Sequence, residues 1–159
     1  MHLLRCIQWA SYLIVLCIWI YTASHFSILP SIIPTHFGAN GLADGYGEKN
    51  DLWILPIIAT IVLFVFDGMI KSRTKLNNPE KNISLQHNSI FERILLSLRV
   101  LQINILLSFF YIIYVSISSA AEKNPSLGIW FLPTFLFAIL IPTVFLCKHS
   151  ITYKKNETN

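Results

Sequence analysis

The chain has 159 residues, of which 54% are hydrophobic and only 13% are charged, about half the charged share of a soluble globular domain. This composition excludes a soluble domain and predicts an integral membrane protein, with the lipid bilayer as its main surroundings. No polar segment is long enough to form a second domain, so residues 1–159 are expected to form a single membrane domain. The net charge of +4 does not indicate nucleic-acid binding, because the basic residues flank apolar runs instead of alternating with aromatic residues.

Four apolar runs predict an all-α fold with four transmembrane helices. The first run, residues 6–29, exceeds the roughly 7–15 residues of a signal-peptide core, so we expect an uncleaved helix. It pairs with the second run to form a helical hairpin over residues 5–70, and the third and fourth runs form another over residues 90–147. Between the hairpins lies a basic loop, residues 71–89, and a polar tail follows over residues 148–159.

The distribution of Lys and Arg predicts the orientation in the membrane. With the amino terminus inside, nine basic residues fall on the inner face, and only Lys49 and Lys123 fall outside. Both termini, the loop 71–89 and the tail 148–159 are therefore expected to be cytoplasmic. The segment between the first two helices, residues 29–52, then faces the extracytoplasmic side.

Residues 29–52 hold most of the chemistry in the chain, including four of its six glycines. Pro30 and Pro34 are expected to end the first helix, because a residue before proline favours an extended conformation. The pair Asp44-Gly45 predicts a turn, and other glycines in the segment allow a positive φ. We therefore expect an ordered extracytoplasmic loop that folds back toward the second helix.

Three interpretations of the polar residues in this loop stay open at the level of sequence. In the first, they form hydrogen bonds with one another and with the backbone in a structural cap. In the second, they bind a ligand or protein from outside. In the third, the imidazole of His36 and the carboxylates of Asp44 and Glu48 form a catalytic or metal site. The last has no helical metal-ligand spacing, and we predict no catalytic residue, metal or cofactor. The residues assigned to a ligand-binding or structural motif are Pro30, Pro34, His36, Phe37, Asn40, Gly41, Asp44, Gly47, Glu48 and Lys49.

Asp67 and Arg99 are the ionisable residues expected within or at the edge of the membrane. At 1.5 Å per residue, both fall roughly 22–27 Å from the outer boundary. We predict that they pair near the inner interface, the alternative being that each side chain extends to water independently. The three cysteines, Cys6, Cys17 and Cys147, form no metal-binding pattern and are expected to be free thiols buried among apolar residues.

The segment PSIIPTHFGANGLADGYGEK, residues 30–49, followed by the apolar run with Pro56, resembles the domain of unknown function 1648 (DUF1648). That domain occurs at the amino end of SdpI-type bacterial membrane proteins. The resemblance covers residues 5–70 and implies a bacterial cytoplasmic membrane and an outward-facing loop. SdpI itself gives immunity to a secreted toxin and holds a transcriptional repressor at the membrane. The resemblance does not extend to the longer SdpI-type carboxyl half, of which we expect no copy in residues 71–159. The matching positions are Pro30, Pro34, His36, Phe37, Gly41, Asp44, Gly47 and Lys49.

Together these features predict a multi-pass membrane protein whose outer loop recognises an extracytoplasmic peptide or envelope ligand, in signalling or immunity. The basic loop 71–89 is expected to contact a cytoplasmic protein or anionic lipid. Enzymatic activity is not expected. The alternative from another class is a small membrane transporter or a metal-dependent membrane enzyme.

Overall fold

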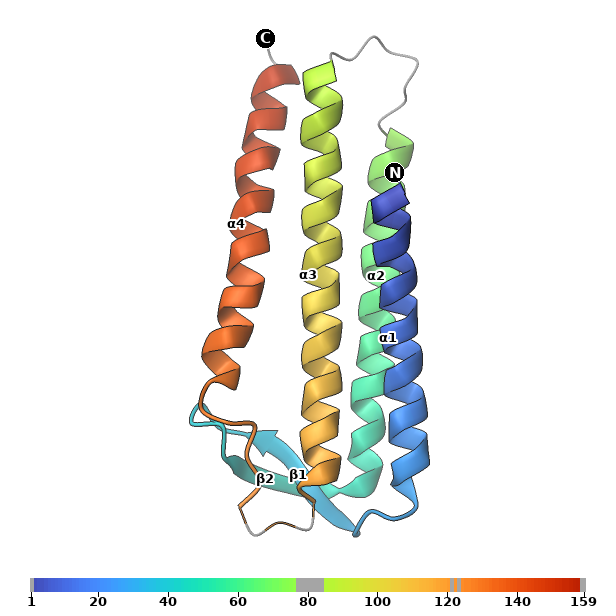
Figure 1. The fold of residues 1–159 in the computed structure, drawn as a ribbon, viewed down its shortest axis with the longest axis vertical. Helices are drawn as coiled ribbons and strands as arrows, with labels where there is room; N and C mark the ends of the chain where they lie inside the picture. Colours follow the sequence, from blue (N-terminus) through green and yellow to red (C-terminus); the bar gives the residue numbers. More distant parts are fainter. Residues whose placement is uncertain (1, 77–84, 121, 123, 158–159) are drawn as a thin grey trace.

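A computed structural model describes residues 2–76, 85–120, 122 and 124–157. Four helices run along one axis, and a two-stranded hairpin closes one end of the bundle (Figure 1). The amino end of the first helix and the carboxyl end of the last lie at the end opposite to the hairpin (Figure 1). The elements in chain order are α1 (His2–Phe26), β1 (Ile32–Phe37), β2 (Ala43–Glu48), the 3-10 helix η1 (Lys49–Trp53), α2 (Ile54–Leu76), α3 (Leu85–Ser118) and α4 (Phe131–Glu157).

Within the described residues, three stretches are long and apolar enough to cross a membrane: His2–Phe26, Lys49–Thr74 and Phe91–Ser118. Each has at least 25 residues, and the hydrocarbon core of a bilayer needs about 20. The helix α4 contains a shorter apolar stretch, Phe131–Phe145. These helices indicate a multi-pass membrane protein.

The core lies where α1, α2 and α3 face one another, and α4 packs mainly on α3. Ile18 of α1 and Leu106 and Ile113 of α3 are completely buried at this junction. A smaller apolar cluster lies at the end away from the hairpin, around Ile70 and Leu98. Most outward-facing apolar side chains are exposed in the isolated chain, as expected for helices whose outer faces contact lipid.

The segment 29–52 is ordered but not helical, so the all-α prediction is wrong there. β1 and β2 form an antiparallel pair in which Ile32 lies opposite Glu48 and Phe37 lies opposite Ala43. The turn predicted at Asp44-Gly45 is also wrong, because both residues lie within β2. The chain instead reverses between Gly38 and Gly41, where the Gly38 amide donates to the carbonyl of Leu42 at 2.9 Å. Gly41 supplies the positive φ, 79°, that this turn requires.

Three predicted boundaries need correction. The loop 71–89 is shorter than predicted, because α2 continues to Leu76 and α3 begins at Leu85; residues 77–84 lie outside the described part of the chain. The tail is helical as far as Glu157. The fourth helix begins at Phe131 instead of residue 127.

The prediction that the cysteines are buried is wrong. They are free but exposed on the helix surfaces, where their small apolar side chains can face lipid.

Candidate functional site

The β-hairpin is attached to the α3–α4 connection by backbone hydrogen bonds. The Ala43 amide donates to the carbonyl of Pro125 at 2.9 Å, and the Leu127 amide donates to the carbonyl of Gly41 at 2.8 Å. The Ser126 hydroxyl also donates to the Gly41 carbonyl, at 3.0 Å. Ile33 of β1 is 1% exposed and belongs to the main core. The hairpin is therefore fixed on both of its sides, with one side against the bundle and the turn against the connection.

A contact between an imidazole and a carboxylate lies on the exposed side of the hairpin. Nδ1 of His36 contacts Oδ1 of Asp44, and these two side chains are 72% and 55% exposed. His36 lies opposite Gly45, where a Cβ would come within 2.8 Å of the His36 Cβ. Glycine at position 45 thus leaves room for the imidazole to lie across β2 and reach the neighbouring carboxylate.

Alternation along β2 places Asp44, Tyr46 and Glu48 on the same exposed face. Tyr46 is 54% exposed. Two carboxylates therefore lie on this face, whereas the exposed Asp51 of η1 lies on the side of β2 toward which a Cβ on Gly47 would point. We call the side chains of His36, Asp44, Tyr46 and Glu48 the outer face.

Several residues of the predicted motif build the hairpin instead of lining the outer face. Pro34 is fully buried, and the half-buried Phe37 ends β1. The Asn40 side chain accepts a hydrogen bond from the Leu42 amide at 3.0 Å, which stabilises the turn beside Gly41.

The remaining motif residues lie where the hairpin meets the helices. Pro30 is exposed in the link between α1 and β1. Gly47 lies against Asp51, whose Oδ2 would be 2.5 Å from an added Cβ. The Lys49 ammonium lies 5.0 Å from the centre of the Phe26 ring. The motif therefore separates into an exposed group and a group that positions it.

A second group of polar residues lies inside the helical bundle. The structure brings Asp67 of α2 and Arg99 of α3 together as an ion pair whose side chains are 15% and 5% exposed. The Tyr12 hydroxyl of α1 donates to the same carboxylate, and Gln8 Nε2 donates to it at 3.4 Å. Three helices thus share one carboxylate.

Gln102 completes this polar group on the side of α3. Arg99 Nη1 donates to Gln102 Oε1 at 2.8 Å, and Gln102 Nε2 donates to the carbonyl of Leu63 on α2 at 3.3 Å. A buried polar side chain is costly in a membrane unless it is paired, and here each has a partner. Asn104, by contrast, donates to the carbonyl of Val100 in its own helix, at 3.0 Å.

Gln8 and Tyr12 were not predicted as members of this group. They are four residues apart, so they lie on one face of α1, and that spacing was the available signal. Within the described ranges, no group of three or more His, Cys, Asp or Glu side chains is placed to hold a metal ion.

Residues 13–60 match the family described as "Domain of unknown function (DUF1648)". A protein of Archaeoglobus fulgidus described as "Uncharacterized protein" is 38% identical to this chain over 61 residues, which is 38% of the chain and 33% of the relative. The match thus spans about one third of the relative's length. No solved structure matches the chain significantly. The resemblance seen in the sequence is confirmed: the greater part of α1, the β-hairpin and the start of α2, residues 13–60, form a DUF1648 domain.

Proposed function

We propose that this membrane protein recognises a cationic peptide outside the cell through the outer face, as part of signalling or immunity. The observation that carries the proposal is the exposed pair of His36 and Asp44 on a hairpin held against the helical bundle. Even a fully charged pair at an exposed position contributes only about 0–1 kcal/mol to stability. The contact between His36 and Asp44 therefore adds little to the stability of the fold. In a binding surface, the same contact would hold the Asp44 carboxylate in a fixed position.

The composition of the outer face supports a cationic peptide as the ligand. Asp44 and Glu48 are exposed carboxylates, and Tyr46 adds an exposed aromatic ring between them along β2. Complementary charge steers a partner and sets its orientation, and aromatic side chains are frequent binding hot spots. Lys49, the neighbouring lysine, is engaged with the Phe26 ring.

The proposed setting is a bacterial cytoplasmic membrane, with four spans, cytoplasmic termini and the outer face in the extracytoplasmic space. The excess of Lys and Arg at the end of the bundle away from the hairpin supports this orientation. The helix α4, with 27 residues, is long enough at 1.5 Å per residue to cross the roughly 30 Å of hydrocarbon. A cytoplasmic protein partner, suggested by the basic residues there, would transmit the signal.

The test is peptide retention by the purified protein in nanodiscs of zwitterionic lipid. Culture medium of the source organism is separated by charge, passed over the protein, and the retained peptides are identified by mass spectrometry. We expect retention from the cationic fraction, and its loss in the double variant Asp44→Asn, Glu48→Gln. The matched control is Glu122→Gln, which removes an exposed carboxylate outside the hairpin and should retain the same peptides.

Three results would count against recognition. Retention of no cationic peptide by the wild type, or the same retention by the double variant, would contradict the proposal. Loss of retention together with a lower melting temperature would assign the carboxylates a structural role instead.

A further inference from the structure

A cavity of about 990 Å³ lies between α1, α2 and α3 at the end of the bundle away from the hairpin. Its size is at the upper end of the roughly 300–1,000 Å³ typical of small-molecule sites. Lys71 near the end of α2 and Arg5 near the start of α1 line its outer part. The Asp67–Arg99 pair, one or two helical turns further along, lines its inner part.

The charges lining this cavity favour an anion. Arg99 is already paired with Asp67, which leaves Arg5 and Lys71 opposite one carboxylate, Glu92. All three of these side chains are exposed and can reorient. Gln8 and Tyr12, which also line the cavity, donate to the Asp67 carboxylate and so compensate its charge together with Arg99.

The apolar part of the lining favours a lipid over a soluble anion. Leu4, Phe64, Ile70 and Leu95 contribute to the cavity walls from all three helices. A cavity with cations near its mouth and apolar walls matches a phosphate headgroup that continues into an acyl chain. Basic pockets between transmembrane helices bind anionic headgroups in this way.

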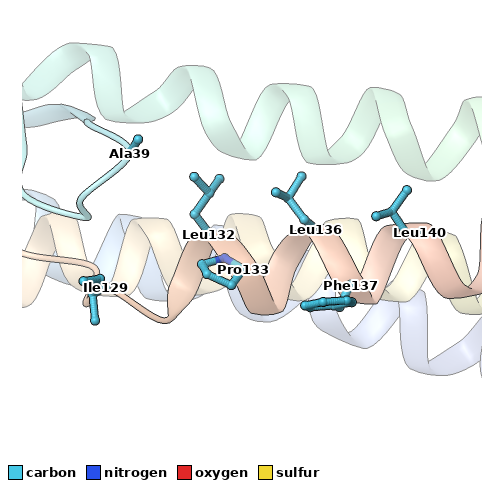
Figure 2. Close-up of a pocket in the computed structure, with 7 residues that line it drawn as sticks. All are labelled: Ala39, Ile129, Leu132, Pro133, Leu136, Phe137 and Leu140. Atoms are coloured by element: carbon cyan, nitrogen blue, oxygen red, sulfur yellow. The ribbon is translucent and has the colours of Figure 1, made fainter.

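A second cavity among the described residues, near the hairpin, differs in both its charge and its lining. It has a volume of about 400 Å³ and lies between Ala39 of the hairpin turn and the start of α4. Its lining is apolar, with Leu132, Leu136 and Leu140 projecting from one side of α4 (Figure 2). An acyl chain could lie there, but nothing in it distinguishes one headgroup from another.

We propose that the larger cavity binds the phosphate headgroup of an anionic phospholipid from the adjoining leaflet, through Arg5 and Lys71. Phosphatidylglycerol is the probe. The site requires only that the helices lie in a bilayer, and it is independent of the peptide recognition proposed above. The lipid would occupy the space next to the Asp67–Arg99 pair and exclude water from it.

The experiment measures lipid retention by native mass spectrometry, on protein released from nanodiscs that contain equal amounts of phosphatidylglycerol and phosphatidylcholine. The wild type should retain phosphatidylglycerol in preference. The substitutions Arg5→Gln and Lys71→Gln should each lower that preference roughly fivefold, and the double variant roughly 25-fold, from the usual contribution of one cation near an anionic lipid surface.

Three controls separate the site from general charge effects. Arg93→Gln removes an exposed cation of α3 that does not line the cavity, and should keep the wild-type preference. Leu136→Ala alters the apolar cavity and should also keep it. Arg5→Lys retains the charge and should restore most of the preference lost in Arg5→Gln.

The proposal is overturned if the double variant keeps the wild-type preference, or if Arg93→Gln loses as much as Arg5→Gln. A soluble anion is tested by adding glycerol 3-phosphate. Its displacement of bound phosphatidylglycerol at equal concentration would assign the cavity to a soluble phosphate compound and overturn the assignment to a lipid. Failure of that compound to compete is the expected result.

Discussion

Gly41 contacts the backbone of Gly128 at the point where the hairpin turn meets the α3–α4 connection. A Cβ on Gly41 would lie 2.6 Å from the Gly128 carbonyl oxygen and 2.8 Å from its carbonyl carbon. Both glycines have a positive φ, 79° and 84°. The absence of a side chain at Gly41 thus allows the two segments to approach closely enough for the hydrogen bond between Leu127 and Gly41.

Gly41→Ala should therefore lower the free energy of unfolding by about 2–5 kcal/mol. A left-handed backbone costs a non-glycine residue about 1–2 kcal/mol, and overpacking against a backbone that must shift adds about 1–3 kcal/mol. Thermal and denaturant unfolding of the protein in detergent, followed by circular dichroism, measures the change. Retained peptide or lipid is not needed for this measurement.

The chain offers two matched glycine controls. Gly128 has a positive φ but an added Cβ there meets nothing within 4 Å, so Gly128→Ala should cost only about 1–2 kcal/mol. Gly68 lies in α2 with open space around it, and Gly68→Ala should stabilise the helix by about 0.5–1 kcal/mol. Equal losses at positions 41 and 128 would argue against the close approach.

The buried ion pair predicts strong coupling between Asp67 and Arg99. Asp67→Asn and Arg99→Gln should each lower the free energy of unfolding by about 3–5 kcal/mol, because each leaves one buried charge without its partner. The double variant should cost less than the sum, with a coupling of about 0.5–3 kcal/mol. A double-mutant cycle of unfolding measurements in detergent provides the values.

The pair formed by His36 and Asp44 is the natural comparison, because it also joins a basic side chain to a carboxylate, but on an exposed surface. The cycle with His36→Ala and Asp44→Ala should give a coupling below about 1 kcal/mol. Simple additivity at Asp67 and Arg99 would contradict a functional pairing of those two residues within the membrane.

The Tyr12 hydroxyl should stabilise the bundle through its hydrogen bond to the Asp67 carboxylate. Tyr12→Phe is expected to cost about 1.5–3 kcal/mol, the range for a hydrogen bond to a charged group. In the Asp67→Asn background the cost should fall to about 0.5–1.5 kcal/mol, since the acceptor is then neutral. Tyr46→Phe, at an exposed position, is the control and should change stability by less than about 0.5 kcal/mol. An unchanged cost in the Asp67→Asn background would mean that the hydroxyl acts elsewhere.

The helices could be predicted from sequence because their signal depends on composition and on the fixed rise of an α-helix. The same rise places Asp67 and Arg99 at one depth from the sequence alone, and the structure brings their side chains together. Tyr12 could not be added to them, because the rotation of α1 about its axis depends on packing against α2 and α3. Which face of α1 is buried is seen only in the folded chain.

The hairpin was harder to predict because a tertiary contact determines its register. Asp44-Gly45 is a strong local turn signal, yet Gly45 serves within β2 by leaving space for His36. The actual turn is stabilised by Ser126 and Leu127, more than 80 residues away along the chain. The same contact keeps residues near Gly128 out of α4, which explains the late start of that helix.

The orientation of the bundle can be tested by labelling cysteines from one side of the membrane. The three native cysteines are exposed and are first replaced by serine. Glu48→Cys lies on the outer face, while Thr74→Cys and Lys148→Cys lie toward the opposite end, at exposed positions of α2 and α4. Because Lys and Arg are concentrated at that opposite end, a membrane-impermeant maleimide should label only Glu48→Cys in intact spheroplasts. Thr74→Cys and Lys148→Cys should react after permeabilisation.

Each outcome of the labelling bears on a different part of the proposed arrangement. Labelling of Lys148→Cys together with Glu48→Cys would mean that α4 does not cross the membrane, which leaves three spans. The fully reversed pattern would place the outer face in the cytoplasm and remove its access to a peptide outside the cell. The expected pattern requires α4 to span the bilayer, since Lys148 follows shortly after its apolar stretch, Phe131–Phe145. A helix of 27 residues reaches across roughly 40 Å at 1.5 Å per residue, so its polar end can extend into water beyond the hydrocarbon while its apolar stretch stays within it.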